Sequence, residues 1–355
     1  MKILVISPHP EGFAPGQRLK YEQYFEYFKK NDIEVVVSPF ISEKFLKIIY
    51  RKGYILHKIY FTISGYFQRI KDIFRIKKYD GLYIFLYVTP FGPPIFEWVY
   101  TKIQPNFIYD IDDLVYLKRK NRENPIAEKL RGRSKIPFLI KRAKHVITCT
   151  PYLDDYAKIF NLNTTDISST IDTDKYIPKI KKNESLNITI GWSGSHSTVN
   201  YLNMLENVLH QIQAKYGVKI LVIGDASFSI TNVSVEAINW SLSTEVEDLK
   251  RIDIGLYPLP DEKWVYGKSG LKALQYMALG IPTIATAVGA NFRIIEDGIS
   301  GFLVENEIQW YNTIEKLILD SNLRTEIGLR GRERVEKFYS IKANRDKYLN
   351  ILKSL

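Results

Sequence analysis

The sequence has a single cysteine, Cys149, so the chain cannot form an internal disulfide. It has no Cys-x-x-Cys pair and no Cys/His cluster of the kind that holds zinc or an iron–sulfur centre. Long apolar runs are also missing: only five apolar or small residues separate Lys2 from Pro8, and prolines interrupt the stretch 81–96. These absences favour a protein of a reducing cytoplasm, without a signal peptide or a transmembrane helix.

Low-complexity stretches are absent as well, which argues against a mostly disordered protein. Apolar residues make up 45% of the chain and aromatic residues 13%, enough to fill substantial cores. At 355 residues the chain exceeds one ordinary domain. We therefore expect two domains.

Acidic residues are scarce in the first half only. Residues 1–180 carry 30 Lys and Arg against 19 Asp and Glu, whereas the remainder carries 20 of each. Residues 44–79 hold ten basic residues, nine Phe or Tyr and one acid, Asp72, and residues 118–145 add eleven basic residues. Basic aromatic helices favour a peripheral contact with an anionic membrane. Nucleic acid is the rival partner, disfavoured because no nucleic-acid-binding motif is present, and a solvated basic face is the third interpretation.

Apolar, β-branched runs alternate with helical spacing, which predicts parallel sheets with helices on both faces, an α/β architecture of two doubly wound domains. We expect domains at 1–178 and 179–340, joined by a polar linker, with 341–355 as a helix that crosses back to the first. The expected strands are 2–7, 34–38, 81–88, 107–111, 145–148, 186–191, 219–224, 254–257 and 283–286. The expected helices include 17–30, one opened by Thr150 and Pro151, 199–216, 243–251 and 269–279.

Two stretches of small polar residues lie where a strand gives way to a helix. The first, GWSGSHST, offers Ser193, Gly194, Ser195 and His196, and the second brings together Lys268, Ser269 and Gly270. Hydroxyls, amides and a lysine at helix starts suit a phosphate or diphosphate, although a plain Ser-capped helix start explains the first stretch equally well. Neither stretch is a Walker A loop, and no Gly-x-Gly-x-x-Gly follows the first strand.

The segment DIGLYPLPDEKWVYGKSGLKALQYMALGIPTIATAVG, with EDGISGFLV after it, resembles the C-terminal donor-binding domain of glycosyltransferase family 4. The resemblance implies the GT-B fold, two Rossmann-like domains that face a cleft. It also implies a nucleotide-sugar as donor substrate, with neither a cofactor nor a metal ion. In that family a Glu-x7-Glu pair contacts the donor sugar and the ribose, and this chain has Gly267 and Gln275 at those places. The resemblance therefore assigns the ribose to Gln275 and the diphosphate to Lys268, Ser193, Ser195 and the loop amides.

In the first domain the resemblance places Gly16 and Arg18 across the cleft from the diphosphate, with a solvated helix-start arginine as the alternative for Arg18. Asp110 and Asp112 end a predicted strand, and we expect them to bind the acceptor or assist its deprotonation. These carboxylates could also bind a metal ion, but we disfavour this interpretation because the GT-B fold that the resemblance implies does not require a metal ion. Trp240 is expected beside the nucleobase, with a core position as the alternative.

The predicted function is transfer of a sugar from a nucleotide-diphosphate donor to a glycan or lipid-linked acceptor, with retention, in cell-surface polysaccharide or glycolipid synthesis. The expected location is the inner face of the plasma membrane. Two rivals remain: a GT-B nucleotide-sugar epimerase, and a non-catalytic sugar-binding or membrane-scaffold protein.

Overall fold

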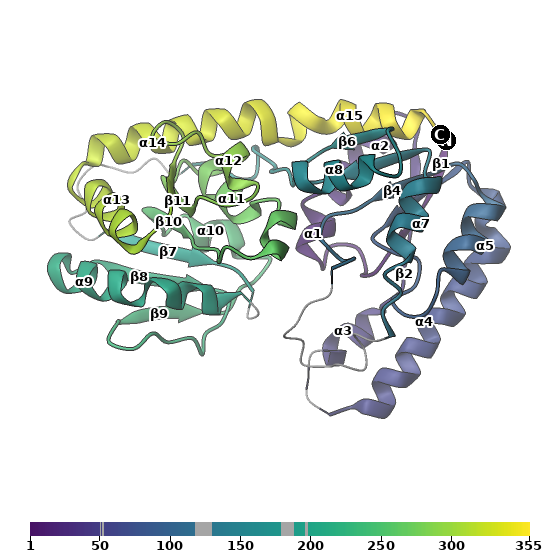
Figure 1. Cartoon of the computed structure of the whole chain (residues 1–355), viewed down its shortest axis with the longest axis horizontal. Coiled ribbons are helices and arrows are strands. Elements are labelled where there is room, and N and C mark those ends of the chain that lie inside the picture. The colour runs from purple at the N-terminus through teal and green to yellow at the C-terminus, as the bar shows by residue number, and fades with distance from the viewer. Residues whose placement is uncertain (50, 52, 118–129, 179–187, 196–197) are drawn as a thin grey trace. The chain divides into compact units, whose positions relative to one another are not determined.

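The computed structural model describes residues 1–49, 51, 53–117, 130–178, 188–195 and 198–355 (Figure 1). Contacts divide the chain into two compact units. The first is Met1–Ser169 together with Asn344–Leu355, and the second is Thr170–Ala343. The domain bounds expected from the sequence, 1–178 and 179–340, stay a prediction; by contacts the second unit begins earlier, at Thr170.

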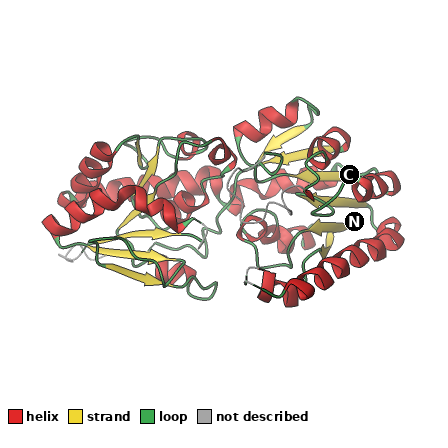
Figure 2. Cartoon of the chain, turned by 60° about the horizontal axis from the view of Figure 1, so that its bottom comes forward, coloured by secondary structure: helices red, strands yellow, loops and turns green. Residues whose placement is uncertain are grey.

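The first unit is a parallel six-stranded sheet in the order β2-β1-β3-β4-β5-β6, with helices on both faces (Figure 2). Its strands are β1 (Lys2–Ser7), β2 (Glu34–Pro39), β3 (Gly81–Phe85), β4 (Phe107–Asp110), β5 (His145–Thr148) and β6 (Thr164–Asp166). Its helices are α1 (Pro15–Arg18), α2 (Phe25–Lys29), α3 (Glu43–Ile49), α4 (Ile55–Arg75), α5 (Ile95–Ile103), α7 (Lys135–Arg142) and α8 (Pro151–Lys158).

The second unit is also a parallel six-stranded sheet, in the order β12-β11-β10-β7-β8-β9. Its strands are β7 (Thr189–Ser193), β8 (Lys219–Ile223), β9 (Val235–Ile238), β10 (Ile254–Tyr257), β11 (Thr283–Thr286) and β12 (Phe302–Val304). Its helices are α9 (Glu206–Tyr216), α10 (Glu245–Leu249), α11 (Leu271–Ala278), α12 (Asn291–Ile294), α13 (Glu307–Leu319) and α14 (Ser321–Arg334), and α15 (Ile341–Lys353) follows.

Both strand orders reverse direction once, and the reversal fixes where a ligand can enter. In the first sheet the chain changes direction between β1 and β3, and in the second between β7 and β10. At such a point the loops after two neighbouring strands leave toward opposite faces, which opens a crevice at the carboxyl ends of the strands. Each unit therefore has one crevice position, defined by its own topology.

Short apolar runs place the inner strands accurately. The strands β1, β5, β10 and β11 begin and end at the predicted residues. The predicted cap at Thr150 is confirmed, since its hydroxyl accepts from the Leu153 amide at 3.2 Å. The single helix expected over 17–30 is wrong: α1, a 3₁₀ turn at Glu22–Tyr24 and α2 replace it.

Buried polar groups inside that stretch explain the break. Lys20 is fully buried and its ammonium forms an ion pair with Asp110 at the end of β4. Gln17 is also buried, and its amide donates to the Glu22 carboxylate at 2.9 Å. A regular amphipathic helix would point these groups into an apolar core without such partners.

The longest helix, α4, is fastened to the first sheet by one buried arginine. Arg69 has no exposed surface, and its guanidinium donates to three carbonyl oxygens, those of Ser7, Ser38 and Val88, at 2.7–2.9 Å. Its charge is compensated by Asp72, which is also buried, at 3.2 Å. These bonds fix the carboxyl ends of β1 and β2 and the loop after β3. Among the described residues, no helix combines the length and the apolar content needed to cross a bilayer.

The segment Asn344–Leu355 completes the core of the first unit. Tyr348 is fully buried and its ring centroid lies 4.7 Å from that of Tyr24. The Leu355 side chain reaches Gly81 at the start of β3, where a Cβ would lie 2.7 Å from it. The C-terminal helix expected to cross back to the first domain thus supplies part of that unit's packing.

Candidate functional site

In the second unit, the loop after β7 lies at the reversal of strand order and closes on itself. The hydroxyls of Ser195 and Thr198 are 3.2 Å apart, and the Thr198 hydroxyl lies 3.1 Å from the Ser195 carbonyl oxygen. The Ser193 amide donates to the Tyr276 hydroxyl at 2.6 Å, and the Gly194 amide donates to the Ile223 carbonyl at 2.9 Å. The expectation that these loop amides face an anion is therefore wrong for Ser193 and Gly194, whose amides already have partners within the protein.

The cation at this loop is Lys272, in the first turn of α11. Its ammonium donates to the Thr198 hydroxyl at 3.2 Å and lies 4.2 Å from the centroid of the Trp192 ring. A Cβ at Gly194 would lie 2.5 Å from the same ammonium. Any larger residue at this position would therefore clash with the Lys272 side chain as it is placed. The amine of Lys272 is thus held beside the loop after β7, at the reversal of strand order between β7 and β10.

The helix that carries Lys272 is held close to the sheet. Its N-cap, Gly270, has φ +70°, and a Cβ there would lie 2.1 Å from Ile294, so a side chain is excluded both by backbone conformation and by space. One turn after Lys272, the buried Tyr276 makes the bond to the Ser193 amide. The β7 loop and α11 are therefore linked by hydrogen bonds on both sides of the Lys272 ammonium.

The electrostatics of Lys272 are unusual for a lysine. Burial, followed by the positive charge of Lys268, lowers the pKa of the Lys272 ammonium to about 7. The half-buried ammonium lies 4.2 Å from the Trp192 ring centroid and 5.7 Å from that of Tyr257, in the first turn of a helix, where the helix dipole disfavours a cation. An anion bound at this place would offset the burial of the ammonium and the positive charges of Lys268 and of the helix terminus.

The other predicted residues of the second stretch lie around this centre. The Lys268 ammonium lies 5.7 Å from the centroid of the Trp264 ring. Ser269 and Gly270 form the turn into α11. The prediction for His196 falls outside the described residues. Lys268, Ser195 and Lys272 are therefore brought to one locality of the second unit, with Lys272 making the direct contact to the β7 loop.

Gln275 belongs to a buried polar network. Its amide nitrogen donates to the Tyr176 hydroxyl at 2.9 Å and to the Glu245 carboxylate at 3.2 Å. Glu245 in turn accepts from the Tyr176 hydroxyl at 2.8 Å and from the Trp240 indole at 3.0 Å. Both amide hydrogens of Gln275 are used in this way, so a ribose hydroxyl could bond only to its amide oxygen. Trp240 packs against the core of the second unit, which supports the core alternative for that residue.

Neither Lys272 nor Glu245 is among the residues predicted from the sequence, although each leaves a signal there. Lys272 is a lysine between Leu271 and Ala273 in the first turn of a predicted helix, an electrostatically poor place. Glu245 lies in the first turn of the predicted helix 243–251, where an acidic residue is ordinary. Only the fold shows that it faces Gln275.

In the first unit the structure separates the two predicted carboxylates. Asp110 is fully buried, and both its oxygens are occupied, one by the Lys20 ammonium and one by the Tyr83 hydroxyl. Burial raises the pKa of the Asp110 carboxyl, against the opposing effect of Lys20. Asp112 is half-buried, and a Cβ at Gly16 would lie 2.4 Å from its Oδ2. Asp110 is thus a core ion pair, whereas Asp112 is brought together with Gly16 at the carboxyl edge.

Arg18, the last residue of α1, is half-buried, and its Nε is itself buried. It is therefore not the fully solvated arginine of the alternative interpretation. Its predicted contact with a phosphate or an acceptor stays a prediction.

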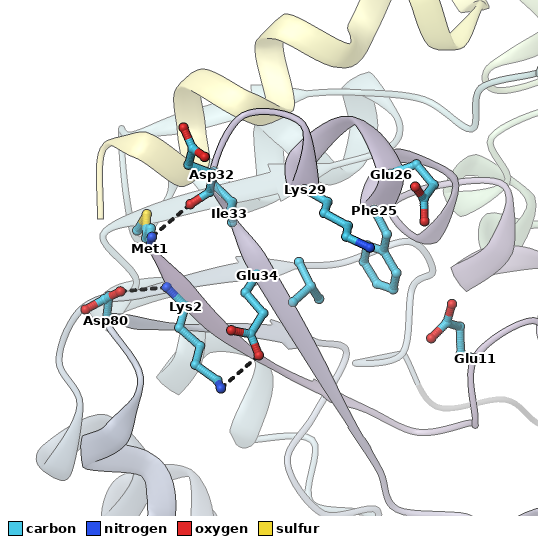
Figure 3. A pocket seen from close by; sticks show the side chains of 11 residues that line it. Met1, Lys2, Glu11, Phe25, Glu26, Lys29, Asp32, Ile33, Glu34 and Asp80 are labelled. Atoms are coloured by element: carbon cyan, nitrogen blue, oxygen red, sulfur yellow. Dashed lines mark hydrogen bonds and ion pairs between the residues drawn. The ribbon is translucent and has the colours of Figure 1, made fainter.

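The opposite, amino edge of the first sheet also has a cavity, where Lys2 and the terminal amine have partners within the protein (Figure 3). The Lys2 ammonium pairs with Glu34 at 2.8 Å, the Lys2 amide donates to Asp80 at 2.6 Å, and the terminal amine donates to the Asp32 carbonyl at 2.8 Å. Because ligands of open α/β sheets bind at the carboxyl ends of the strands, we assign no site here.

Comparison with known proteins finds sequence similarity over part of the chain. Residues 187–320 match the family described as "Glycosyl transferases group 1". Among curated proteins the chain is similar to the capsular polysaccharide biosynthesis glycosyltransferase CapM of Staphylococcus aureus, 28% identical over 184 residues that cover 48% of this chain and 47% of CapM. A trehalose synthase of Pyrococcus horikoshii is 36% identical over 87 residues, 24% of this chain and 21% of that protein. The matches thus span less than half the length of these relatives.

Solved structures extend the likeness to the whole chain. Anabaena HepE, in complex with UDP-glucose, has a TM-score of 0.70 at 16% identity, with full coverage of both chains. Sucrose-phosphate synthase of Thermosynechococcus elongatus has a TM-score of 0.71 at 17% identity, covering 100% of this chain and 98% of that one. The predicted GT-B fold, with two parallel six-stranded sheets, is confirmed.

Proposed function

We propose that the protein is a glycosyltransferase of family 4 that binds a nucleotide-diphosphate sugar through its second unit and a glycan or lipid-linked acceptor through its first. The observation that carries the proposal is the ammonium of Lys272, held over the β7 loop at the reversal of strand order. The family match over residues 187–320 supports a donor site in this unit, and the UDP-glucose complex of a structural neighbour supports a nucleotide-sugar as the donor.

The proposed reaction moves one glycosyl group. The acceptor hydroxyl oxygen forms a bond to the anomeric carbon, the bond from that carbon to the diphosphate oxygen breaks, and the hydroxyl proton passes to the leaving diphosphate. Lys272 and Lys268 would stabilise the negative charge that develops on the leaving group, so the proposal includes no metal ion and no cofactor. Retention of the anomeric configuration is part of the proposal, as is a role for Asp112 in positioning the acceptor hydroxyl.

The experiment that tests this function is a calorimetric titration with UDP-, GDP-, ADP- and CMP-sugars in a buffer that contains EDTA. We expect one nucleotide to bind, with UDP as the first candidate because UDP-glucose occupies the structural neighbour. NMR of the mixture then separates the alternatives. Slow release of free sugar supports a transferase, conversion to another nucleotide-sugar indicates an epimerase, and no binding of any donor rejects the proposal.

The lowered pKa of Lys272 predicts a pH dependence of donor binding. UDP-glucose has no diphosphate proton to lose near pH 7, and a bound anion raises the pKa of Lys272 above its free value of about 7. Between the two pKa values the complex holds a proton that the free protein lacks, so the affinity should fall as the pH rises above 7, by at most about tenfold per pH unit.

Calorimetry at pH 8 in buffers of different ionisation enthalpy measures this proton uptake directly. The variant Lys272→Met, which has no ammonium to titrate, should bind without taking up a proton. Equal proton uptake by the variant and the native protein would assign the linkage to another group.

We also propose that the first unit attaches to the inner face of an anionic membrane, in a pathway of cell-surface polysaccharide or glycolipid synthesis. Support comes from α4, whose outward face carries apolar side chains spaced four and three residues apart. The exposed fraction of these side chains ranges from 40% to 82%. They are Leu56, Tyr60, Ile63, Phe67, Ile70 and Phe74. The one acid of the region, Asp72, is buried against Arg69 and Arg75, so the surrounding lysines keep their excess charge. Flotation with phosphatidylglycerol vesicles tests this surface.

A further inference from the structure

The first unit has a cavity of about 490 Å³ at the carboxyl edge of its sheet. Residues that follow three neighbouring strands line it: Pro8 and His9 after β1, Ile41 after β2 and Tyr87 after β3. This is the edge where open α/β sheets bind ligands, and the strand order reverses here between β1 and β3. A ligand of the first unit is therefore expected in this cavity.

The backbone fixes His9 in the wall of the cavity. His9 stands between Pro8 and Pro10, whose rings restrict the chain on both sides of it. The side-chain amide of Gln17 accepts from the His9 amide at 3.0 Å and donates to the His9 carbonyl oxygen at 3.0 Å. Gln17 is fully buried, and it donates in turn to the Glu22 carboxylate at 2.9 Å. The loop after β1 thus fixes the position of His9 without using its imidazole ring.

The imidazole ring of His9 suits a hydroxyl group. Toward the described residues, the hydrogen bonds of His9 involve its backbone alone. Burial lowers the pKa of the ring, so at pH 7 it is neutral, with one N–H that donates and one nitrogen that accepts. A hydroxyl also donates and accepts, whereas a phosphate or carboxylate anion only accepts. A neutral imidazole therefore matches a hydroxyl better than it matches an anion.

The cations that line the cavity are engaged within the protein. The Lys58 ammonium donates to the Arg51 carbonyl oxygen at 2.6 Å, and the Lys135 ammonium donates to two carbonyl oxygens at 2.7 and 2.8 Å. Arg131 and Arg133 also have interactions within the protein. These contacts give no reason to assign an anionic ligand to the cavity.

Another part of the wall is apolar. Phe40, Phe45 and Ile49 line it, and the Phe45 ring stacks on Phe61 of α4 with centroids 5.5 Å apart. A sugar ring has hydroxyls at its rim and C–H groups on its faces, so it can bond to an imidazole and pack on apolar side chains at the same time. The cavity volume lies in the range of small-molecule sites, about 300–1,000 Å³.

We propose that this cavity binds a neutral sugar residue of the acceptor, with the His9 imidazole hydrogen-bonded to one of its hydroxyls and the sugar ring packed against Phe40 and Phe45. The inference rests on the proposed function, because it names the group of the acceptor that the first unit recognises: a sugar, whether in a free glycan or linked to a lipid. His9 acts in binding, and the proton of the reacting hydroxyl still passes to the leaving diphosphate.

The test is NMR of the histidine rings of the whole chain, titrated with methyl glycosides of glucose, galactose, mannose and N-acetylglucosamine. Concentrations up to about 100 mM detect even weak binding. The chain has five histidines, so substitution of His9 identifies the signals of its ring. We expect one glycoside to shift the His9 signals until they saturate, while the signals of His57 stay unchanged.

Two variants measure what the imidazole contributes. His9→Phe keeps a ring but removes both nitrogens, and it should bind that glycoside about tenfold more weakly in ligand-observed NMR. His9→Gln keeps a donor and an acceptor, and it should lose less affinity. His57→Phe is the matched control, since His57 is exposed on α4 of the same unit, and it should bind as the native protein does. Thermal unfolding verifies that all three variants fold.

Three results would overturn the proposal: no glycoside shifts the His9 signals, His9→Phe binds as tightly as the native protein, or His57→Phe loses as much affinity as His9→Phe. Calorimetric titration with UDP-glucose keeps these outcomes separate from the proposed function. A protein that binds UDP-glucose while its His9 ring responds to no glycoside retains that function and loses only this acceptor site. A protein that binds neither loses both.

Discussion

Replacing Lys272 by methionine is expected to weaken the binding of UDP-glucose by about 10- to 100-fold, the loss of a charge-assisted hydrogen bond of roughly 1.5–3 kcal/mol. Methionine is an unbranched apolar side chain one atom shorter than lysine, so it removes the ammonium that lies beside the β7 loop and over the Trp192 ring without introducing a bulkier group. Calorimetry gives the affinity, and initial rates of donor hydrolysis give the effect on turnover.

The same substitution should leave the fold intact or make it more stable. Lys272 has a pKa of about 7 in the folded protein, well below the ordinary value for lysine. Between these two values the unfolded chain binds the extra proton, so the stability of the native protein rises with pH across that window and is lower at pH 7 than above it. Lys272→Met removes this penalty, and its melting temperature at pH 7 should equal or exceed the native one.

Lys263→Met is the matched control, because Lys263 is exposed in the turn that precedes α11. It should change the affinity for UDP-glucose less than threefold. If Lys272→Met binds the donor as well as the native protein does, the β7 loop is not the diphosphate site. Loss of binding in both variants would point instead to long-range attraction by the whole second unit.

Replacing Asp110 by asparagine is expected to lower the free energy of unfolding of the first unit by about 3–5 kcal/mol, because the Lys20 ammonium is left in the core without its counter-charge. Chemical denaturation followed by fluorescence measures this loss. The double variant Lys20→Met/Asp110→Leu removes both charges and should recover much of the stability.

Asp112→Asn is the companion variant that separates the two predicted carboxylates. Asp112 is half-buried at the sheet edge, so the substitution should cost less than about 1 kcal/mol of stability. Turnover should nevertheless fall if Asp112 positions the acceptor hydroxyl. A large loss of stability in Asp112→Asn, with little loss in Asp110→Asn, would contradict the assignment of Asp110 to the core and of Asp112 to the sheet edge.

The inner strands and both strand-to-helix loops are predictable from the sequence because each is marked by a local pattern. Runs such as KILVIS and DIGLY are apolar on both faces, as buried parallel strands must be. The edge strands β6, β9 and β12 give no such signal, since Thr164–Asp166, for example, is short and only half-buried. Their pairing is decided by the neighbouring strand rather than by their own side chains.

The candidate site was harder to predict for a related reason. The sequence places Lys268 at a helix start, but only the packing of α11 against β7 brings Lys272 to Thr198. Gln275 and Glu245 are thirty residues apart, and nothing local indicates that they share a hydrogen bond. The pairing of Lys20 with Asp110 spans ninety residues and redirects a predicted catalytic carboxylate into the core. Long-range polar contacts of this kind are set by the fold, not by local composition.

The return of Asn344–Leu355 to the first unit has a consequence for biosynthesis. These residues leave the ribosome after the entire second unit, so the cavity that receives Tyr348 beside Tyr24 stays open during most of translation. Thr170–Ala343 is continuous in sequence and can complete its fold first, although the first unit begins earlier. The first unit would then remain incompletely folded, with part of its core accessible to chaperones, until the last turns of α15 have been synthesised.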